Sequence, residues 1–257
     1  MSVIYVTGDT HGELRRFRRD IFFEQAEMTK DDYVIILGDF GTVWYSPDDS
    51  VHQKMERYML DELDDRSFTT LFIPGNHENY DRLLSDEFEE VSWHGGRVRM
   101  IRPSVMMLMR GDMYEIDGAK FFAFGGASSH DIFDGILDGN DPDWRKKAKR
   151  LEKQGKGFYR VKGVSWWEQE LPTEEEMAHG IETLDQNGWT ADFVLTHCAP
   201  SSVQAMLGFH QTDCLTKYLE DVKARLHYKR WFFGHYHTNR VVSTSDMVLY
   251  EQIVRIR

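Results

Sequence analysis

Short apolar runs alternate with amphipathic stretches over the first 75 residues of the chain. Continuous apolar runs at Val3–Val6, Tyr33–Leu37 and Thr70–Ile73 predict buried strands. Apolar residues at helical spacing between these runs predict helices at Glu13–Met28 and Asp48–Leu63. The stripe expected to be buried on the second helix is Val51, Met55, Tyr58 and Met59. Strands and helices that alternate in this way are typical of a parallel sheet with right-handed crossovers.

The pattern changes in the middle of the chain, where three short apolar runs lie close together. Val105–Met109, Met113–Ile116 and Lys120–Phe124 each have the length of a strand. The dipeptide Asp117-Gly118 separates the last two and is a strong signal for a tight hairpin turn. Antiparallel pairing is therefore expected in this region.

The last third of the chain returns to one long helix followed by strands. Thr173 and Glu176 have the spacing of a capping box at a helix start, and Asn187-Gly188 is typical of its end. Asp192–Leu195 and Trp231–Phe233 are apolar runs that predict further buried strands. A final hairpin is predicted from two segments: Val241–Ser243 and Val248–Ile256. No repeat or linker divides the chain, so one domain is expected over residues 1–257.

Composition narrows the class of protein. The chain has 257 residues, of which 41% are hydrophobic and 29% charged, as in ordinary globular proteins. A net charge of −12 disfavours broad binding to nucleic acid or to anionic membranes. No apolar stretch approaches the ~18 residues that a membrane span needs. The start of the chain reads as a strand and not as an export signal, and Cys198 and Cys214 lack paired spacing, so a cytoplasmic location is expected.

Five short polar clusters, each directly after an apolar run, carry the candidate chemistry. They are Asp9-Thr10-His11, Gly38-Asp39, Gly75-Asn76-His77-Glu78, Thr196-His197 and Gly234-His235-Tyr236-His237. Sites in α/β sheets form beyond the carboxyl ends of the strands, so these clusters are expected to converge. Oxygen and imidazole ligands of this kind suit two divalent metals, with one carboxylate left to bridge them.

Each cluster alone has a simpler interpretation. Asp9-Thr10-His11 could cap a helix, Gly38-Asp39 and Asn76 suit turns, and a single His197 is more often an interior residue. All five in this order at strand ends favour the metal site. The i, i+2 pairs in the first and last clusters would point to one side in an extended backbone. Glycines at positions 8, 38, 75 and 234 allow the backbone to approach a ligand closely.

The residues of these clusters and their order along the chain resemble the motifs of the calcineurin-like metallophosphoesterases, from Asp9 to His237. The resemblance implies an α/β fold: a four-layer α/β/β/α sandwich of two mixed sheets flanked by helices. It also implies the ligands of two metals. The first metal would take Asp9, His11, Asp39 and His237. The second would take Asp39, Asn76, His197 and His235.

The activity implied by the resemblance is hydrolysis of a phosphate monoester or diester by a hydroxide that bridges the two metals. His77 would be the catalytic residue, either steadying the transition state or protonating the leaving oxygen, and orientation of a metal ligand is its alternative role. Glu78 would anchor this histidine. Two Mn²⁺ ions are the first expectation for the metals, with Fe or Zn²⁺ as alternatives.

Substrate contacts are expected from two further segments. Ser128 and His130 follow the strand Lys120–Phe124 and could reach the active face. Residues 144–162 carry nine of the 31 basic residues, including Arg150. Such a run is usually a solvated helix face, and the alternative is a movable basic flap at about residues 141–170 that binds substrate phosphates.

The expected partner is a small phosphorylated substrate, nucleotide-like because aromatic residues such as Trp44 and Trp166 could stack on a base. No membrane partner is expected, and nucleic acid is disfavoured by the charge. Two other functions remain as alternatives: a non-catalytic metal-binding scaffold of the same fold, and a nuclease that acts on nucleic-acid ends.

Overall fold

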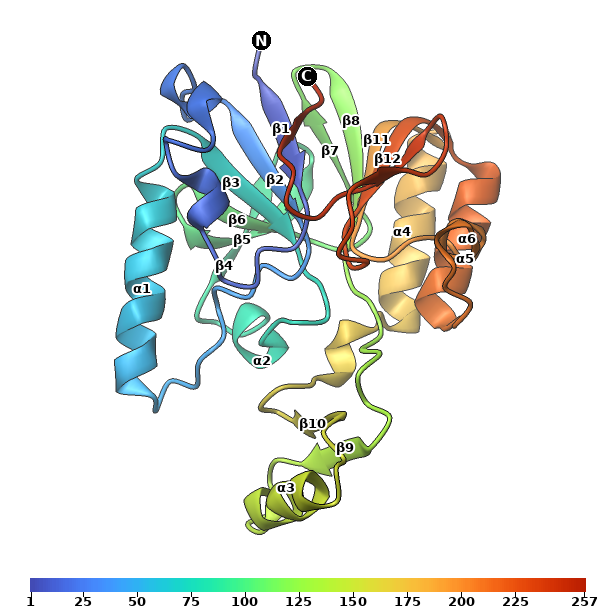
Figure 1. The fold of residues 1–257 in the computed structure, drawn as a ribbon. Helices are drawn as coiled ribbons and strands as arrows, with labels where there is room; N and C mark the ends of the chain where they lie inside the picture. Colours follow the sequence, from blue (N-terminus) through green and yellow to red (C-terminus); the bar gives the residue numbers. More distant parts are fainter.

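Two large mixed sheets pack face to face in the computed structural model, which describes residues 1–257 (Figure 1). The first sheet has the strand order β15-β1-β2-β3-β6-β5-β4. Its strands are β1 (Ile4–Thr7), β2 (Tyr33–Leu37), β3 (Thr69–Ile73), β4 (Glu89–Trp93), β5 (Gly96–Arg102), β6 (Val105–Leu108) and β15 (Val254–Arg255). The second sheet has the order β13-β14-β12-β11-β8-β7. Its strands are β7 (Asp112–Ile116), β8 (Ala119–Phe124), β11 (Thr190–Thr196), β12 (His227–Phe233), β13 (Arg240–Val241) and β14 (Asp246–Val248).

Helices cover the outer face of each sheet. The α-helices are α1 (Ser50–Asp64), α2 (Tyr80–Leu83), α3 (Trp144–Lys153), α4 (Glu174–Gln186), α5 (Ser201–Leu207) and α6 (Cys214–Arg225). Side chains such as Val6, Leu71, Phe121 and Phe232 form a core between the sheets. A second core lies under α4 and α6, and a third lies beneath α1. The predicted four-layer sandwich of two mixed sheets is therefore confirmed.

The segment after β1 departs from the predicted helix at Glu13–Met28. It forms only two short 3₁₀ turns, η1 (Arg15–Phe17) and η2 (Phe23–Ala26). The buried amide of Gln25 donates to the carbonyl oxygens of Phe17 and Phe22 at 2.9 and 2.7 Å. Because a side chain occupies carbonyls that a continuous helix would need for its own amides, the prediction was wrong.

Helix α1 forms where it was predicted, but with another face buried. Val51, Met55 and Tyr58 are 75%, 59% and 65% exposed. The buried positions are Gln53, Glu56, Leu60 and Leu63. Glu56 is held inside by an ion pair with Arg82 at 2.6 Å and by hydrogen bonds from the backbone amides of residues 44 and 45. The inner face of α1 therefore carries polar residues that are paired with other groups. The spacing of apolar residues alone does not reveal such a face.

Turn and capping signals were more reliable. Asp117 and Gly118 have φ of 51° and 75° and join β7 to β8 as a hairpin. Helix α4 begins at the predicted capping box. The hairpin of β4 and β5 was missed, because its charged residues break the apolar pattern. Near the end of the chain β13 and β14 form a hairpin, but β14 ends at Val248, where the predicted second strand begins, and β15 crosses to the other sheet and pairs with β1.

Residues between β8 and α4 form a projection at the end of the molecule away from the two termini (Figure 1). It contains β9 (Gly135–Asp138), α3, β10 (Tyr159–Lys162) and the 3₁₀ turn η3 (Glu168–Glu170). Strands β9 and β10 pair in parallel as a separate small sheet. None of the helices combines the length and the apolar character that crossing a membrane would require.

Candidate metal centre

The residues predicted to bind metal follow the carboxyl ends of five strands of the two sheets. Asp9 and His11 follow β1, Asp39 follows β2, and Asn76 follows β3. The remaining three, which follow the second sheet, are His197 after β11, and His235 and His237 after β12. Segments far apart in the sequence therefore meet between the sheets, as the strand topology requires.

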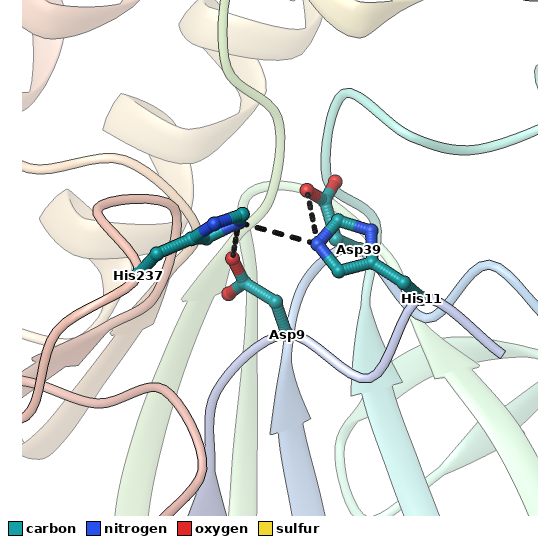
Figure 2. A group of neighbouring side chains, drawn as sticks. All are labelled: Asp9, His11, Asp39 and His237. Atoms are coloured by element: carbon teal, nitrogen blue, oxygen red, sulfur yellow. Dashed lines mark hydrogen bonds and ion pairs between the residues drawn. The ribbon is translucent and has the colours of Figure 1, made fainter. Parts of the chain in front are cut away.

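Asp9, His11, Asp39 and His237 form the first group (Figure 2), whose donor atoms all lie within 4.8 Å of one another. The Nε2 atoms of His11 and His237 are 3.2 Å apart. His237 Nε2 lies 3.2 Å from Asp9 Oδ2, and His11 Nε2 lies 3.8 Å from Asp39 Oδ2. Side chains from the loops that follow β1, β2 and β12 thus point their nitrogens and oxygens at one place.

The second group gathers around His197, which is fully buried. Its Nδ1 donates to the carbonyl oxygen of Leu37 at 2.7 Å, which leaves Nε2 directed into the site. That Nε2 lies 3.2 Å from Asp39 Oδ1 and 3.3 Å from Asn76 Oδ1. The ring of His235 is 5.0 Å from the His197 ring, centroid to centroid. Asp39 contacts both groups, with Oδ2 facing His11 and Oδ1 facing His197.

The distances between these donor atoms match those between ligand atoms that bind one cation. Ligand atoms about 2.1 Å from one cation lie about 3.0 Å apart in octahedral and about 3.4 Å apart in tetrahedral geometry. Four of the contacts above fall at 3.2, 3.2, 3.2 and 3.3 Å. Asp9 Oδ2 is buried and makes no hydrogen bond of good geometry, with His237 Nε2 3.2 Å away. Because such an oxygen is costly without a cation or a donor, the residues fit divalent metals.

Backbone amides orient the two carboxylates. The amide of His235 donates to Asp9 Oδ1 at 3.0 Å, and the amide of His77 donates to Asp39 Oδ1 at 2.7 Å. Burial would lower the pKa of His197, but Asp39 and Asp9 raise it to about 9. Burial lowers the pKa of His235 to about 3. A proton on His197 Nε2 and a cation would compete for the same place, so a cation bound there would displace the proton.

The backbone route to this geometry differs from the predicted one. His11, His235 and His237 have φ of 49°, 69° and 46°, in the left-handed region, so the assumption of an extended backbone was wrong for both i, i+2 pairs. Tight turns at the strand ends aim these rings. The prediction that glycines allow a close approach is confirmed at two positions. A Cβ at Gly75 would lie 2.1 Å from Asp39 Oδ1, and one at Gly234 would lie 2.3 Å from Asp9 Oδ1.

Glu78 supports the Asp39 loop and does not anchor His77, contrary to prediction. Its buried carboxylate accepts hydrogen bonds from the backbone amides of Phe40, Gly41 and Gly75 at 2.7, 3.2 and 3.4 Å. Burial and then Asp39 raise the pKa of Glu78 to about 8, while the three amides oppose the shift. This carboxylate therefore ties the loop after β2 to the loop after β3.

We expect Glu78→Ala to lower the free energy of unfolding by about 2–4 kcal/mol, because buried amides lose their acceptor. Glu78→Gln keeps one acceptor oxygen and should lose less than half as much. Urea denaturation of the two variants and the wild type measures the difference. Equal stability of Glu78→Ala and the wild type would show that this carboxylate does not hold the loops together.

His77 lies at the edge of the first group, with its ring 5.1 Å from that of His11. Burial, foremost, lowers the pKa of His77 to about 4, and Arg160 adds to the shift. The Arg160 Nη2 lies 3.3 Å from His77 Nε2, and the guanidinium also pairs with Asp131. Neither Arg160 nor Asp131 was singled out from the sequence, since a basic run gives no sign of which cation points inward.

Ser128 and His130 line a cavity of about 440 Å³ beside the second group. The His130 ring is 5.5 Å from that of His235, and Phe133 and Phe209 form other parts of the wall. Arg150, the third predicted substrate contact, lies on the exposed surface of α3. It makes no hydrogen bond or ion pair with a site residue, and Arg160 from the same basic run reaches the site in its place.

Comparison with known proteins agrees with the geometry. No match was found among curated proteins. The family model described as calcineurin-like phosphoesterase matches residues 2–239, nearly the whole chain. The matched range includes all seven predicted metal ligands, Asp39 among them. The chain belongs to the calcineurin-like phosphoesterase family and is a metal-dependent phosphoesterase.

Proposed function

We propose that this chain hydrolyses phosphate monoesters or diesters with the help of two divalent cations. The single observation that carries the proposal is the meeting of seven donor side chains, Asp39 and six others, with one buried oxygen of Asp9 facing His237 and making no hydrogen bond. Asp9, His11, Asp39 and His237 would hold the first cation. Asp39, Asn76, His197 and His235 would hold the second.

Two divalent cations bound there would neutralise charge on the phosphoryl oxygens and lower the pKa of a water molecule towards ~7. The chain itself would fix the geometry, because amides of residues 77 and 235 and the carbonyl of Leu37 orient the ligands. His77 would face the reacting group beside the ligands, where its neutral ring would donate a hydrogen bond, or would pass a proton to the leaving oxygen if the bound phosphate raised its lowered pKa.

The organic part of the substrate would occupy the cavity beside His235. Its wall combines polar groups of Ser128 and His130 with the exposed rings of Phe133 and Phe209. A volume of about 440 Å³ lies in the range of small-molecule sites. Aromatic walls favour a planar group, so the proposed substrate is a small, nucleotide-like phosphate ester.

Hydrolysis assays on metal-stripped protein supplied with Mn²⁺, Fe²⁺ or Zn²⁺ test the proposal. We expect turnover of p-nitrophenyl phosphate or its bis ester, with Mn²⁺ the most effective. A panel of nucleoside and sugar phosphates then tests the cavity, and nucleoside esters should have the lower KM. Metal bound at two equivalents without turnover of any ester would instead support a non-catalytic scaffold.

A further inference from the structure

Arg160 is a basic residue of the projection whose side chain turns inward. It lies on β10, in the small sheet that carries α3, where most basic side chains are exposed. The Arg160 side chain is only 16% exposed. Its guanidinium reaches from the projection to His77, next to the candidate metal centre.

Asp131 fixes the orientation of this guanidinium. Arg160 Nε lies 3.0 Å from Asp131 Oδ1, and Nη2 lies 2.5 Å from Asp131 Oδ2, which is a two-point contact. Such a contact holds the planar group in one orientation. Asp131 follows directly after His130, so the cavity wall and the arginine are positioned by the same loop.

The guanidinium also contacts the ring of His77. Arg160 Nη2 lies 3.4 Å from His77 Nδ1 and 3.3 Å from its Nε2, so it is nearly equidistant from the two ring nitrogens. The cation therefore lies directly beside His77, at the edge of the candidate metal centre.

Arg160 also keeps donors free. Nε and Nη2 contact Asp131 and His77, whereas Nη1 makes no hydrogen bond. Neighbouring cations of the run are occupied locally: Lys146 pairs with Asp143, and Lys162 pairs with Glu168. A shielded guanidinium with unpaired donors beside a phosphate-ester site is suited to bind an anionic oxygen.

We propose that Arg160 is a substrate-binding residue that contacts the reacting phosphoryl group and favours monoesters over diesters; this rests on the proposed function. A monoester near pH 7 carries close to two negative charges and three terminal oxygens. A diester carries one charge and two terminal oxygens. An additional cation beside His77 therefore strengthens binding of the monoester more than that of the diester.

The test uses Arg160→Ala and Arg160→Lys, with Lys162→Ala as the control. Lys162 lies on the same strand and carries the same charge, but pairs with Glu168. Calorimetry on Mn²⁺-loaded protein measures Kd for inorganic phosphate. For Arg160→Ala we expect Kd to rise about 10- to 100-fold, as loss of charge-assisted hydrogen bonds implies, with an intermediate rise for Arg160→Lys.

Kinetics supply the second readout. KM for p-nitrophenyl phosphate should rise by a similar factor in Arg160→Ala, whereas KM for the bis ester should change less than about threefold. Metal content should match the wild type, and so should every measurement on Lys162→Ala. Unchanged phosphate affinity, or equal losses on both esters, overturns the assignment of Arg160. Wild-type protein that binds no metal refutes the proposed function, and this assignment with it.

Discussion

Asp39→Asn is expected to lower kcat by at least about 10³-fold, the largest effect among the site variants. Asp39 Oδ1 lies 3.2 Å from His197 Nε2, and Oδ2 lies 3.8 Å from His11 Nε2, so one side chain serves both ligand groups. Asparagine keeps the size but removes the charge and one acceptor oxygen. Metal analysis should show less than two equivalents bound, and p-nitrophenyl phosphate hydrolysis measures the loss of activity.

Asp192→Asn is the matched control for this variant. Asp192 is a partly buried carboxylate that accepts a hydrogen bond from the amide of Lys120 and pairs with Lys229, away from the site. We expect this control to bind metal and turn over substrate as the wild type does. If Asp39→Asn retained two equivalents of metal and more than a tenth of the activity, the bridging role of Asp39 would be refuted.

Convergence of the site could be predicted because it depends on local signals at strand ends. Buried strands such as Tyr33–Leu37 are continuous apolar runs, and polar residues directly after them emerge at one edge of a sheet. Asp39 and His197 were therefore located without any knowledge of their contacts. Parts of the fold that depend on paired polar groups were not predictable in this way. Glu56 is buried because Arg82 reaches it from another element.

The inward position of Arg160 could not be predicted either, because it also depends on a partner from another part of the chain. Nine basic residues between 144 and 162 look alike in the sequence, and only the tertiary structure shows which one meets Asp131. The roles of Glu78 and Leu37 are likewise set by partners 38 and 160 residues away. Such long-range contacts leave no periodic pattern in the chain.

Both ends of the projection are fastened to the body of the protein, which fixes where Arg160 can lie. The buried Arg110 donates to the carbonyl oxygens of Gly125 and Gln169 at 2.9 and 2.7 Å. Glu170 accepts hydrogen bonds from the amide and hydroxyl of Ser129 and from the indole of Trp166. The two chain segments that enter and leave the projection are thus joined to each other, so its inward arginine is held beside His77 before substrate binds.

His77→Ala is expected to lower kcat by about 10²- to 10³-fold while metal content stays at the wild-type value. Alanine keeps the backbone amide that donates to Asp39 Oδ1 at 2.7 Å, so the carboxylate remains oriented. Asn76→Ala is the contrasting variant, because Asn76 Oδ1 lies 3.3 Å from His197 Nε2 among the predicted ligands. That variant should lose metal, and excess Mn²⁺ should partly restore its activity.

The dependence on the leaving group distinguishes the roles open to His77. If the imidazole gives a proton to the leaving oxygen, the loss in His77→Ala should be greater for an alkyl phosphate than for p-nitrophenyl phosphate, whose leaving group needs no proton. If the imidazole only stabilises charge on the phosphoryl oxygens, the rates for both substrates should fall by the same factor in His77→Ala. Restoration of His77→Ala by excess Mn²⁺ would contradict both roles, because the side chain would then act through a metal ligand.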